Sequence, residues 1–245
     1  MEAIGVIPAR YSSARFSGKV LIDICGKPMV WHVWEQAKKA LLLDEVIIAC
    51  DDERVFKVAS DFGANCVMTA KGHLSGSDRI TEVVSSIDVK IVVNIQADEP
   101  LIKALMIDSL VEALLRDNSI YMATLIKQIE DIHEISDPNI VKVVADNNNF
   151  ALYFSRAPIP YKARESKQRP LYYKHIGIYA YTKDFLFTYK SIPSSSLEYA
   201  ERLEQLRVLQ EGFRIKLIET KFDTIGVDTP KDLERVERIL AKEKA

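Results

Sequence analysis

Short apolar runs alternate with amphipathic stretches through the first half of the chain. The apolar runs are typical of buried strands, and they lie at residues 3–8, 45–50, 64–68 and 90–96. The amphipathic stretches predict helices, and they lie at residues 28–42, 52–63, 77–87 and 104–117. Because short strands that alternate with helices are typical of βαβ units, this half predicts a parallel sheet covered by helices.

The pattern changes from about residue 120 onward. Two strand-like runs flank an Asn-rich turn and predict a hairpin over residues 140–155, and an aromatic strand is expected at 172–182. Near the end, residues 224–228 are expected to finish a strand before a helix with Thr229 as its N-cap.

The fold class that follows is α/β. We predict a Rossmann-like, mostly parallel sheet flanked by helices, with an antiparallel excursion at about residues 130–195, in a single domain over residues 1–245.

Composition limits the possible partners. The 245 residues are 48% hydrophobic and 28% charged, with a net charge of −2, so no global basic field would attract nucleic acid or an acidic membrane. No apolar stretch approaches the roughly 18 residues of a membrane span. Cys25, Cys50 and Cys66 lack metal-ligand spacing and are expected to be reduced. The first residues also lack the features of a signal peptide, so we expect a cytoplasmic protein.

Functional groups in open parallel sheets gather at the carboxyl ends of the strands. The loop after the first strand carries Arg10, Arg15 and Lys19 among small residues, which suits the phosphates of a nucleoside triphosphate. It is not a Walker A loop, because the first glycine is missing and Val20 stands where Ser or Thr would contact Mg²⁺. A solvated basic loop is the alternative interpretation.

A second loop, "HLSGSDR" at residues 73–79, offers Ser75, Gly76 and Ser77 for main-chain and hydroxyl contacts. Asp78 can cap the following helix, while Arg79 can reach an anion or a base. An ordinary helix N-terminus explains the same residue types equally well.

A third loop, "NIQADEP" at residues 94–100, follows a buried strand and presents Gln96, Asp98 and Glu99. Mg²⁺ commonly binds one or two carboxylates plus substrate phosphates, so Asp98 is a candidate ligand and Asp228 a possible second one. The alternatives are a polar turn before Pro100 and a carboxylate that stabilises a helix N-terminus. Spacing alone does not show that Asp98 and Asp228 meet.

Polar side chains in the second half suit a polyhydroxylated acid, with cations for its carboxylate and neutral groups for its hydroxyls. They are Arg156, Lys162, Arg164, Lys174, His175, Tyr179, Glu204 and Gln205. His175 and Tyr179 are four positions apart in a predicted strand and therefore share a face. Alternatively, Leu203, Leu206 and Leu209 form the core face of a helix whose solvated side carries Glu204 and Gln205.

Together these segments resemble the 3-deoxy-manno-octulosonate (Kdo) cytidylyltransferase family, also called CMP-Kdo synthetases. The motifs that carry the resemblance, in chain order, are "IPARYSSARFSGK", "HLSGSDR", "NIQADEP", "FSRAPIPY", "KHIGIYAY", "LEQLRVL" and "GVDTP". The resemblance implies a nucleotide-diphospho-sugar transferase type of fold and an enzyme that converts CTP and Kdo to CMP-Kdo and diphosphate with Mg²⁺. It also implies a homodimer formed through the excursion, acting in lipopolysaccharide biosynthesis.

The resemblance assigns roles residue by residue. Arg10, Arg15 and Lys19 would contact CTP phosphates, and Pro8, Ala9, Ser75, Arg79 and Gln96 would surround the cytidine. Asp98 and Asp228 would bind magnesium and, with Arg15 and Lys19, form the catalytic set. The positions that match sugar contacts are Gln96, Arg156, Arg164, His175, Tyr179, Glu204 and Gln205.

The chain departs from the family pattern at three positions near the nucleotide. Ser17 and Val20 replace two prolines, and Ala97 replaces a glycine. The family arginine after "IPY" is matched by Arg164, with Lys162 as the other candidate.

The implied chemistry is attack by the anomeric hydroxyl of the sugar on the α-phosphorus of CTP. Because His73 is the only histidine near the predicted phosphate loops, activation by a metal is favoured over a side-chain base. Two alternatives stay open from the sequence. One is a cytidylyltransferase for another acidic sugar, such as 8-amino-Kdo or a sialic acid, and the other is a nucleotide-binding regulatory protein without catalysis.

Overall fold

The protein is described by a computed structural model that covers residues 1–12, 18–73, 75–163 and 170–243. Arg15, Ser17 and Arg164 lie outside the described residues, so their predicted roles stay predictions. Within these ranges no helix is long and apolar enough to cross a membrane.

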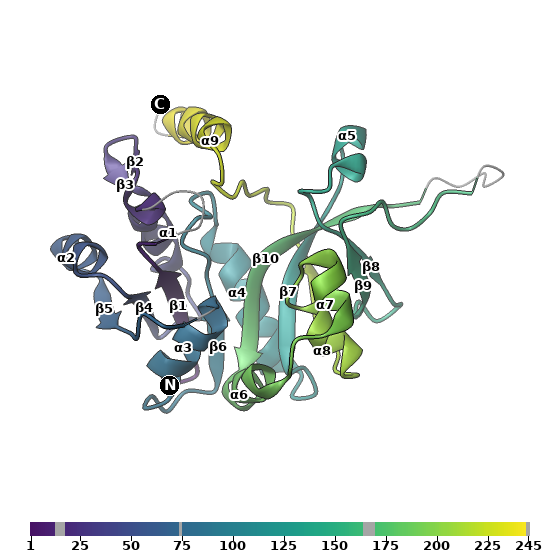
Figure 1. Cartoon of the computed structure of the whole chain (residues 1–245), viewed down its shortest axis with the longest axis horizontal. Coiled ribbons are helices and arrows are strands. Elements are labelled where there is room, and N and C mark those ends of the chain that lie inside the picture. Colours follow the sequence, from purple (N-terminus) through teal and green to yellow (C-terminus); the bar gives the residue numbers. More distant parts are fainter. Residues whose placement is uncertain (13–17, 74, 164–169, 244–245) are drawn as a thin grey trace.

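A large twisted sheet runs through the molecule (Figure 1). Within the described ranges it has nine strands. Its main path is β11 (Lys216–Glu219), β7 (Met122–Gln128), β10 (Tyr173–Thr182), β6 (Ile91–Asn94), β1 (Ala3–Ala9), β4 (Glu45–Cys50) and β5 (Asn65–Met68). The strands β6, β1, β4 and β5 are mutually parallel, which confirms the prediction for the first half.

The second half inserts an antiparallel strand into this sheet. β10 lies between β6 and β7 and runs antiparallel to both. β8 (Lys142–Ala145) and β9 (Ala151–Ser155) form the predicted hairpin, and β8 also pairs with the start of β10. The α/β class and the antiparallel excursion are therefore confirmed.

Helices cover both faces of the sheet because its strands are apolar on both sides. In β1, Ala3 and Ile7 pack into one core and Ile4 and Val6 into the other. The first core lies under α1 (Met29–Ala37), α2 (Glu53–Asp61) and α4 (Ala104–Arg116). The second lies under α3 (Gly76–Val84), α6 (Lys183–Ser191) and α8 (Leu206–Gln210). The shorter helices α5 (Ile132–Ser136) and α7 (Ser196–Glu201) belong to the second half.

The C-terminal segment returns to the N-terminal side of the molecule. There α9 (Pro230–Glu243) lies beside the small pair β2 (Asp23–Ile24) and β3 (Lys27–Pro28), as Figure 1 shows. A third apolar cluster holds it, in which Val236 packs with Ile24 and Val227. The predicted cap is present, since the Asp232 backbone N donates to Thr229 Oγ1 at 3.3 Å.

The strand expected at residues 224–228 is wrong, because this segment is not part of the sheet. It crosses the sheet edge instead, where the Val227 backbone N donates to the Asp98 backbone O at 2.9 Å. The apolar residues Ile225 and Val227 that produced the strand-like pattern pack in the third cluster rather than in a ladder.

Candidate active site

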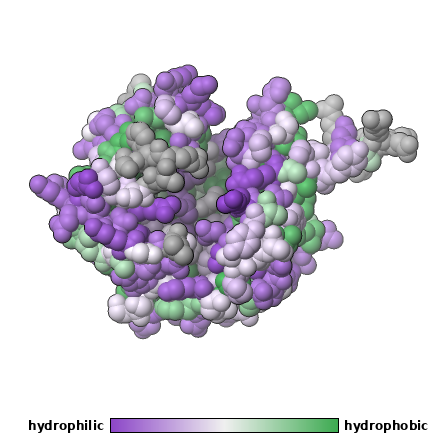
Figure 2. Space-filling model, in the orientation of Figure 1, coloured by the Kyte–Doolittle hydropathy of each residue, from purple (hydrophilic) through white to green (hydrophobic). Residues whose placement is uncertain are grey.

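Two cavities share a wall at the carboxyl edge of the parallel strands. The smaller, of about 140 Å³, lies over the ends of β1 and β6 and the start of α3. The larger, of about 380 Å³, lies between β6, β10 and the turn before α8. The residues common to both cavities are Arg10, Ser75, Gly76, Gln96 and Asp98. Figure 2 shows the surface hollowed between the part that contains β1 and β4 and the part that contains α7.

The two carboxylates that the sequence left unconnected converge on one lysine. Lys19 Nζ lies 2.7 Å from Asp98 Oδ2 and 3.1 Å from Asp228 Oδ1. Lys19 belongs to the short 3₁₀ helix η1 (Lys19–Leu21), which follows the opening loop. Burial lowers the pKa of the Lys19 ammonium, but its interactions with Asp98 and then Asp228 outweigh burial and raise it. Lys19 is therefore a fixed positive charge between two acidic groups.

Glu99 adds a third carboxyl group beside this pair. Burial, together with the neighbouring charge of Asp98, raises the pKa of Glu99 to about 8. Its Oε1 faces Gly226, where a side-chain Cβ would lie only 3.2 Å away, so the close approach favours glycine at that position. Glu99 thus holds its proton at neutral pH, which leaves Asp98 and Asp228 as the charged carboxylates of this corner among the described residues.

The opening loop is tied down at both ends. The Gly18 backbone N donates to the Tyr11 backbone O at 2.7 Å, with Gly18 in the left-handed region at φ 75°. The Tyr11 backbone N donates to Asp51 Oδ1 at 3.0 Å. Arg54 stacks on the Tyr11 ring, with its guanidinium carbon 3.5 Å from the ring centroid. The fold thereby holds Arg10 and Lys19 at the same rim.

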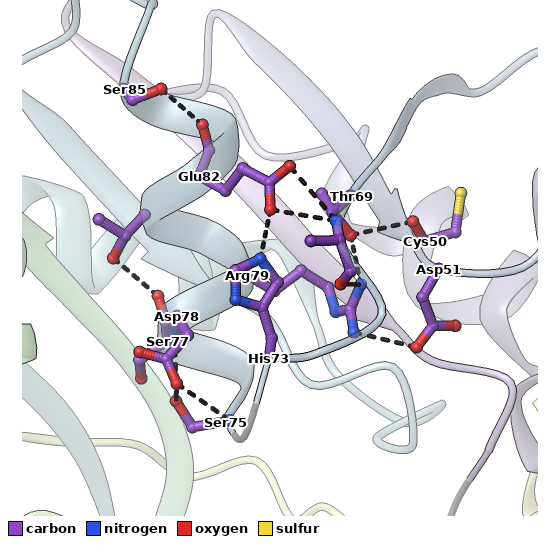
Figure 3. Close-up of polar contacts among 12 residues, drawn as sticks. Cys50, Asp51, Thr69, His73, Ser75, Ser77, Asp78, Arg79, Glu82 and Ser85 are labelled. Carbon is purple, nitrogen blue, oxygen red and sulfur yellow. Dashed lines mark hydrogen bonds and ion pairs between the residues drawn. The ribbon is translucent and has the colours of Figure 1, made fainter.

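The second loop leads into the N-terminus of α3, whose polar contacts Figure 3 shows. Ser75 and Gly76 at this N-terminus line the smaller cavity. Ser75 and Asp78 make a capping box, in which the Asp78 backbone N donates to Ser75 Oγ at 3.1 Å. The prediction that Asp78 caps the following helix is confirmed, and the helix begins at Gly76. A helix N-terminus carries partial positive charge, which favours an anion at this cavity.

Arg79 lines the same cavity but its guanidinium is engaged by the protein. It is 2% exposed, and it donates to Asp51 Oδ2 at 3.0 Å and to Thr69 (Figure 3). His73 similarly pairs with Glu82. Asp51 thus contacts both Arg79 and the backbone of Tyr11, and it joins the second loop to the opening loop.

The larger cavity is lined mainly by neutral polar and aromatic groups. His175, Tyr179, Tyr181 and Tyr189 line it, and the His175 and Tyr179 ring centroids are 5.4 Å apart. The prediction that His175 and Tyr179 share a face is confirmed. Burial raises the pKa of the Tyr179 hydroxyl well above its usual range, so this phenol stays neutral.

Thr124 fixes the orientation of His175. The pairing of β10 with β7 shifts register between Ile176 and Tyr179, so the carbonyl of Ile178 lies outside the regular ladder. The buried Thr124 hydroxyl donates to this carbonyl at 2.7 Å. The hydroxyl has one proton and lies 2.7 Å from the Ile178 carbonyl, 3.2 Å from the Ile176 carbonyl and 2.9 Å from His175 Nε2. With that proton given to the shortest contact, Nε2 is the donor to Thr124 Oγ1. We therefore assign the neutral ring with its proton on Nε2. Burial lowers the pKa of His175 to about 3, which keeps the ring neutral.

Glu204 and Gln205 lie in a turn rather than on the face of a helix. α7 ends at Glu201, and Arg202 adopts the left-handed conformation at φ 56° before α8 begins at Leu206. Both side chains line the larger cavity, and the Tyr189 hydroxyl donates to Glu204 Oε2 at 3.3 Å. The alternative interpretation is right for the leucines, because Leu203, Leu206 and Leu209 pack in the second core. It is wrong for Glu204 and Gln205, which precede α8 and line the cavity instead of a solvated helix side.

Some predicted residues lie outside both cavities. The Arg156 side chain donates to the backbone O of Glu201 at 2.8 Å and of Pro138 at 2.9 Å, and so it ties the excursion together. Lys174 forms ion pairs with Glu134 and Asp223. Lys162 is exposed to solvent. Ala9 is fully buried at the end of β1. The predicted sugar role of Arg156 is not supported by its present contacts and stays a prediction.

Sequence reasoning missed several lining residues of the larger cavity, among them Asn94, Tyr181, Tyr189 and Arg202. Asn94 stood inside the quoted motif "NIQADEP", and its place at a strand end was the available signal. Tyr181 likewise ended the quoted motif "KHIGIYAY", two positions from Tyr179 and therefore on the same face of the strand. Tyr189 and Arg202 carried no signal, because only the packing of α6 and of the turn after α7 brings them to this cavity.

Comparison with known proteins decides the family. The model of the family described as "Cytidylyltransferase" matches residues 4–218. A 3-deoxy-manno-octulosonate cytidylyltransferase of Solibacter usitatus is 52% identical over 97% of this chain and 94% of its own length. The protein of that name from Geotalea uraniireducens is 48% identical over 99% of this chain and all of its own. The chain belongs to the 3-deoxy-manno-octulosonate cytidylyltransferase family.

Solved structures agree with this family. A CMP:2-keto-3-deoxy-manno-octonic acid synthetase complexed with CTP is 43% identical, with a TM-score of 0.93 over 99% of this chain and 100% of that chain. A 4-diphosphocytidyl-2C-methyl-D-erythritol synthase from Anaerococcus prevotii, at 13% identity and a TM-score of 0.65, shares the fold alone. The predicted enzyme class, a nucleotidyltransferase, is thereby confirmed.

Proposed function

We propose that this protein is the enzyme that activates Kdo, converting CTP and Kdo to CMP-Kdo and diphosphate. Near-full-length identity of 52% to a cytidylyltransferase of that name supports the reaction. The observation that carries the mechanism is the pair of cavities joined through Arg10, Gln96 and Asp98, because a two-substrate transfer needs both reactants at one wall.

The smaller cavity suits the nucleotide. Arg10 and Lys19 lie on its rim with the N-terminus of α3, so cationic groups and backbone N–H donors face one space. Arg15 belongs to the same opening loop and is assigned to the phosphates by the family motif. Pro8, Ser75 and Gln96 form the remaining wall, where we place the cytidine.

Asp98 and Asp228 fit a magnesium ion by their donor chemistry. One oxygen of each carboxylate contacts the Lys19 ammonium, so the two oxygens face a common space. The ammonium group shows that this space accepts a positive charge. The described residues hold no cluster of three or more His, Cys, Asp or Glu side chains suited to a metal. A Mg²⁺ site does not need three protein ligands, because water molecules and substrate phosphate oxygens complete its coordination. When bound, Mg²⁺ would neutralise phosphate charge and acidify the attacking hydroxyl.

The chain's own residues position the reactants. In the transfer, the anomeric oxygen of Kdo forms a bond to the α-phosphorus, the bond from that phosphorus to the bridging oxygen of diphosphate breaks, and the anomeric proton leaves to solvent. Lys19, with Arg15 of the opening loop, would stabilise the charge of the departing diphosphate, and Arg10 lies beside Lys19 in the lining of the smaller cavity. Gln96 and Asp98 lie in the wall shared by the two cavities, which supports their proposed role at the reacting centre.

The larger cavity suits the sugar acid. His175, Tyr179 and Gln205 offer neutral hydrogen-bonding groups for hydroxyls, and Arg10 and Arg202 supply positive charge for the carboxylate. With its proton on Nε2 facing Thr124, His175 has Nδ1 left as an acceptor for a substrate hydroxyl.

A homodimer formed through the excursion is part of this proposal. Several large apolar side chains on or beside the excursion are exposed, and they are Ile132, Leu152, Tyr161, Leu171 and Tyr199. Apolar groups concentrated in one region favour a protein contact. A cytoplasmic enzyme whose product enters lipopolysaccharide biosynthesis agrees with the family assignment.

The test is release of diphosphate from CTP with Mg²⁺ across a panel of 2-keto sugar acids that includes Kdo, 8-amino-Kdo and a sialic acid. We expect turnover with CTP and Kdo, and none with either reactant omitted or with EDTA added. Faster turnover of another sugar would replace Kdo as the substrate. CTP binding without diphosphate release on any sugar would identify a regulatory protein.

A further inference from the structure

Asn94 is a buried polar residue that neither the fold nor the assigned site explains. It ends β6, is 4% exposed, and lines the larger cavity. Its Oδ1 has no hydrogen-bond partner in the described part of the chain. Leaving a buried acceptor unpaired destabilises a folded protein, so a ligand is the natural partner for this atom.

The sheet itself favours an apolar residue at this position. Asn94 shares a face of β6 with Val92, which belongs to the second core, and across the ladder it lies opposite Tyr179. The Asn94 amide also hydrogen-bonds to the Tyr181 hydroxyl. That contact uses the amide nitrogen and leaves Oδ1, a buried atom of a residue that lines the larger cavity, as the unpaired group.

A second unpaired atom lines the same cavity and has the opposite hydrogen-bonding character. Gln205 is 6% exposed, and its Nε2 has no partner among the described residues. One orphaned acceptor and one orphaned donor, both neutral, complement alcohol groups, which accept and donate. An acceptor oxygen repels a carboxylate or phosphate, so Asn94 is directed at the hydroxyl-bearing part of the substrate.

We propose that Asn94 is a further sugar-binding residue, whose Oδ1 accepts a hydrogen bond from one hydroxyl of the acidic sugar and sets specificity for it. The inference rests on the proposed function, since it takes the larger cavity as the Kdo site. Asn94 lies outside the lining of the smaller cavity, and its contribution falls on the sugar rather than on CTP.

The experiment measures kcat and KM for each substrate in Asn94→Ala, with Gln205→Ala as a parallel variant and Asn65→Ala as the matched control. Asn65 starts β5, away from both cavities, and pairs with Glu45. We expect a loss of about 10- to 100-fold in kcat/KM for Kdo, the size of one buried hydrogen bond to substrate, with KM for CTP nearly unchanged.

A set of Kdo analogues, each lacking one hydroxyl, identifies the partner. For one analogue the penalty of Asn94→Ala should disappear, because the hydrogen bond is already missing from the substrate. Equal penalties across all analogues, or equal losses for CTP and Kdo, would overturn the assignment. If the unaltered protein does not convert Kdo at all, the proposed function fails instead.

A measurement on the unaltered protein avoids dependence on a folded variant. The Asn94 side-chain amide resonances of ¹⁵N-labelled protein should shift on titration with Kdo and shift less with CTP. Absence of any shift at saturating Kdo would contradict the proposal even if Asn94→Ala could not be purified.

Discussion

The two cavities of the site share a charged wall but differ in the groups that make up most of the remaining lining. Arg10, Lys19 and Asp98 line the smaller cavity and are charged, and Asp228 pairs with Lys19 beside it. None of these four residues belongs to a strand of the sheet. Around the larger cavity, Asn94, His175 and Tyr181 are neutral and lie within the strands themselves. The first arrangement suits a polyphosphate and a metal, and the second suits a polyol.

This difference teaches how each cavity obtains its specificity. Charged loops attract a nucleotide through long-range electrostatics, whereas neutral groups on a sheet recognise hydroxyls only at contact distance. Changes to the charged corner are therefore expected to affect turnover most. Changes to the neutral cavity are expected to affect sugar recognition and the stability of the sheet.

The largest effect is expected at the charged corner. Asp98→Asn and Asp228→Asn should each lower kcat by on the order of 10²–10³-fold, because each removes a carboxylate that would hold the metal. Diphosphate release measures this, with circular dichroism to verify folding. Asp223→Asn is the matched control, since Asp223 precedes the same segment but pairs with Lys127 and Lys174 away from the cavities. Near-normal turnover in both variants would refute the magnesium assignment.

An intermediate effect is expected at the base of the neutral cavity. Thr124→Val keeps the shape of the side chain but removes the hydroxyl that contacts the Ile178 carbonyl and His175. The free energy of unfolding should fall by about 1–3 kcal/mol, and KM for Kdo should rise while KM for CTP stays the same.

Thr124→Ser is the conservative control, because it restores the hydroxyl and should recover most of both properties. Urea unfolding gives the stability, and ¹⁵N shifts of His175 report its tautomer. A dominant Nδ1–H tautomer in the unaltered protein would contradict the proton assignment.

The two regions should respond differently when the pH changes. A single titrating group can change the free energy of unfolding by at most about 1.4 kcal/mol per pH unit. His175 has a pKa of about 3 when folded, below its usual value of 6.5, so the unfolded chain takes up the proton first. Stability should therefore fall as the pH decreases from 6.5 toward 3. His175→Gln should flatten this slope in urea unfolding measured between pH 4 and 6.5.

Glu99 should act in the opposite direction. Its folded pKa of about 8 lies above its usual value of 4.5, so its contribution is complete below pH 4.5 and is lost as the pH rises toward 8. Glu99→Gln should remove this loss. Stability is measured between pH 5 and 8 without added metal in both proteins. The same dependence of the free energy of unfolding on pH in Glu99→Gln and in the unaltered protein would show that Glu99 is charged in the folded protein.

The smallest effect is expected at the cap of α3. Ser75→Ala removes the side-chain acceptor for the Asp78 backbone N and should cost about 1 kcal/mol of stability. KM for CTP should rise only slightly, because the backbone N–H groups of the helix N-terminus remain. Ser85→Ala, at the other end of the same helix, is the control and should be close to neutral in thermal unfolding. Equal losses in both variants would show that the cap has no special role.

The sequence predicted the charged corner better than the neutral cavity for a physical reason. The motifs around Arg10, Ser75 and Asp98 are contiguous loops, and the geometry of parallel strands brings such loops to one edge. The contact of Asp228 with Lys19 depends on residues 224–228, which cross the edge of the sheet. The sequence had predicted a strand for this segment, and that prediction was wrong. Arg79 and Arg156 had the right residue types, but the sequence could not show that protein groups already engage their guanidinium groups.

By itself, the sequence determined the alternation of strands and helices, the antiparallel hairpin and the family, because apolar periodicity and contiguous motifs are local properties of the chain. Only the tertiary structure decided that Lys19 lies between Asp98 and Asp228, that Thr124 orients His175, and that Asn94 faces a cavity with its acceptor unpaired. Each of these contacts joins residues from different elements, and burial and hydrogen bonding between elements are set by packing rather than by local sequence.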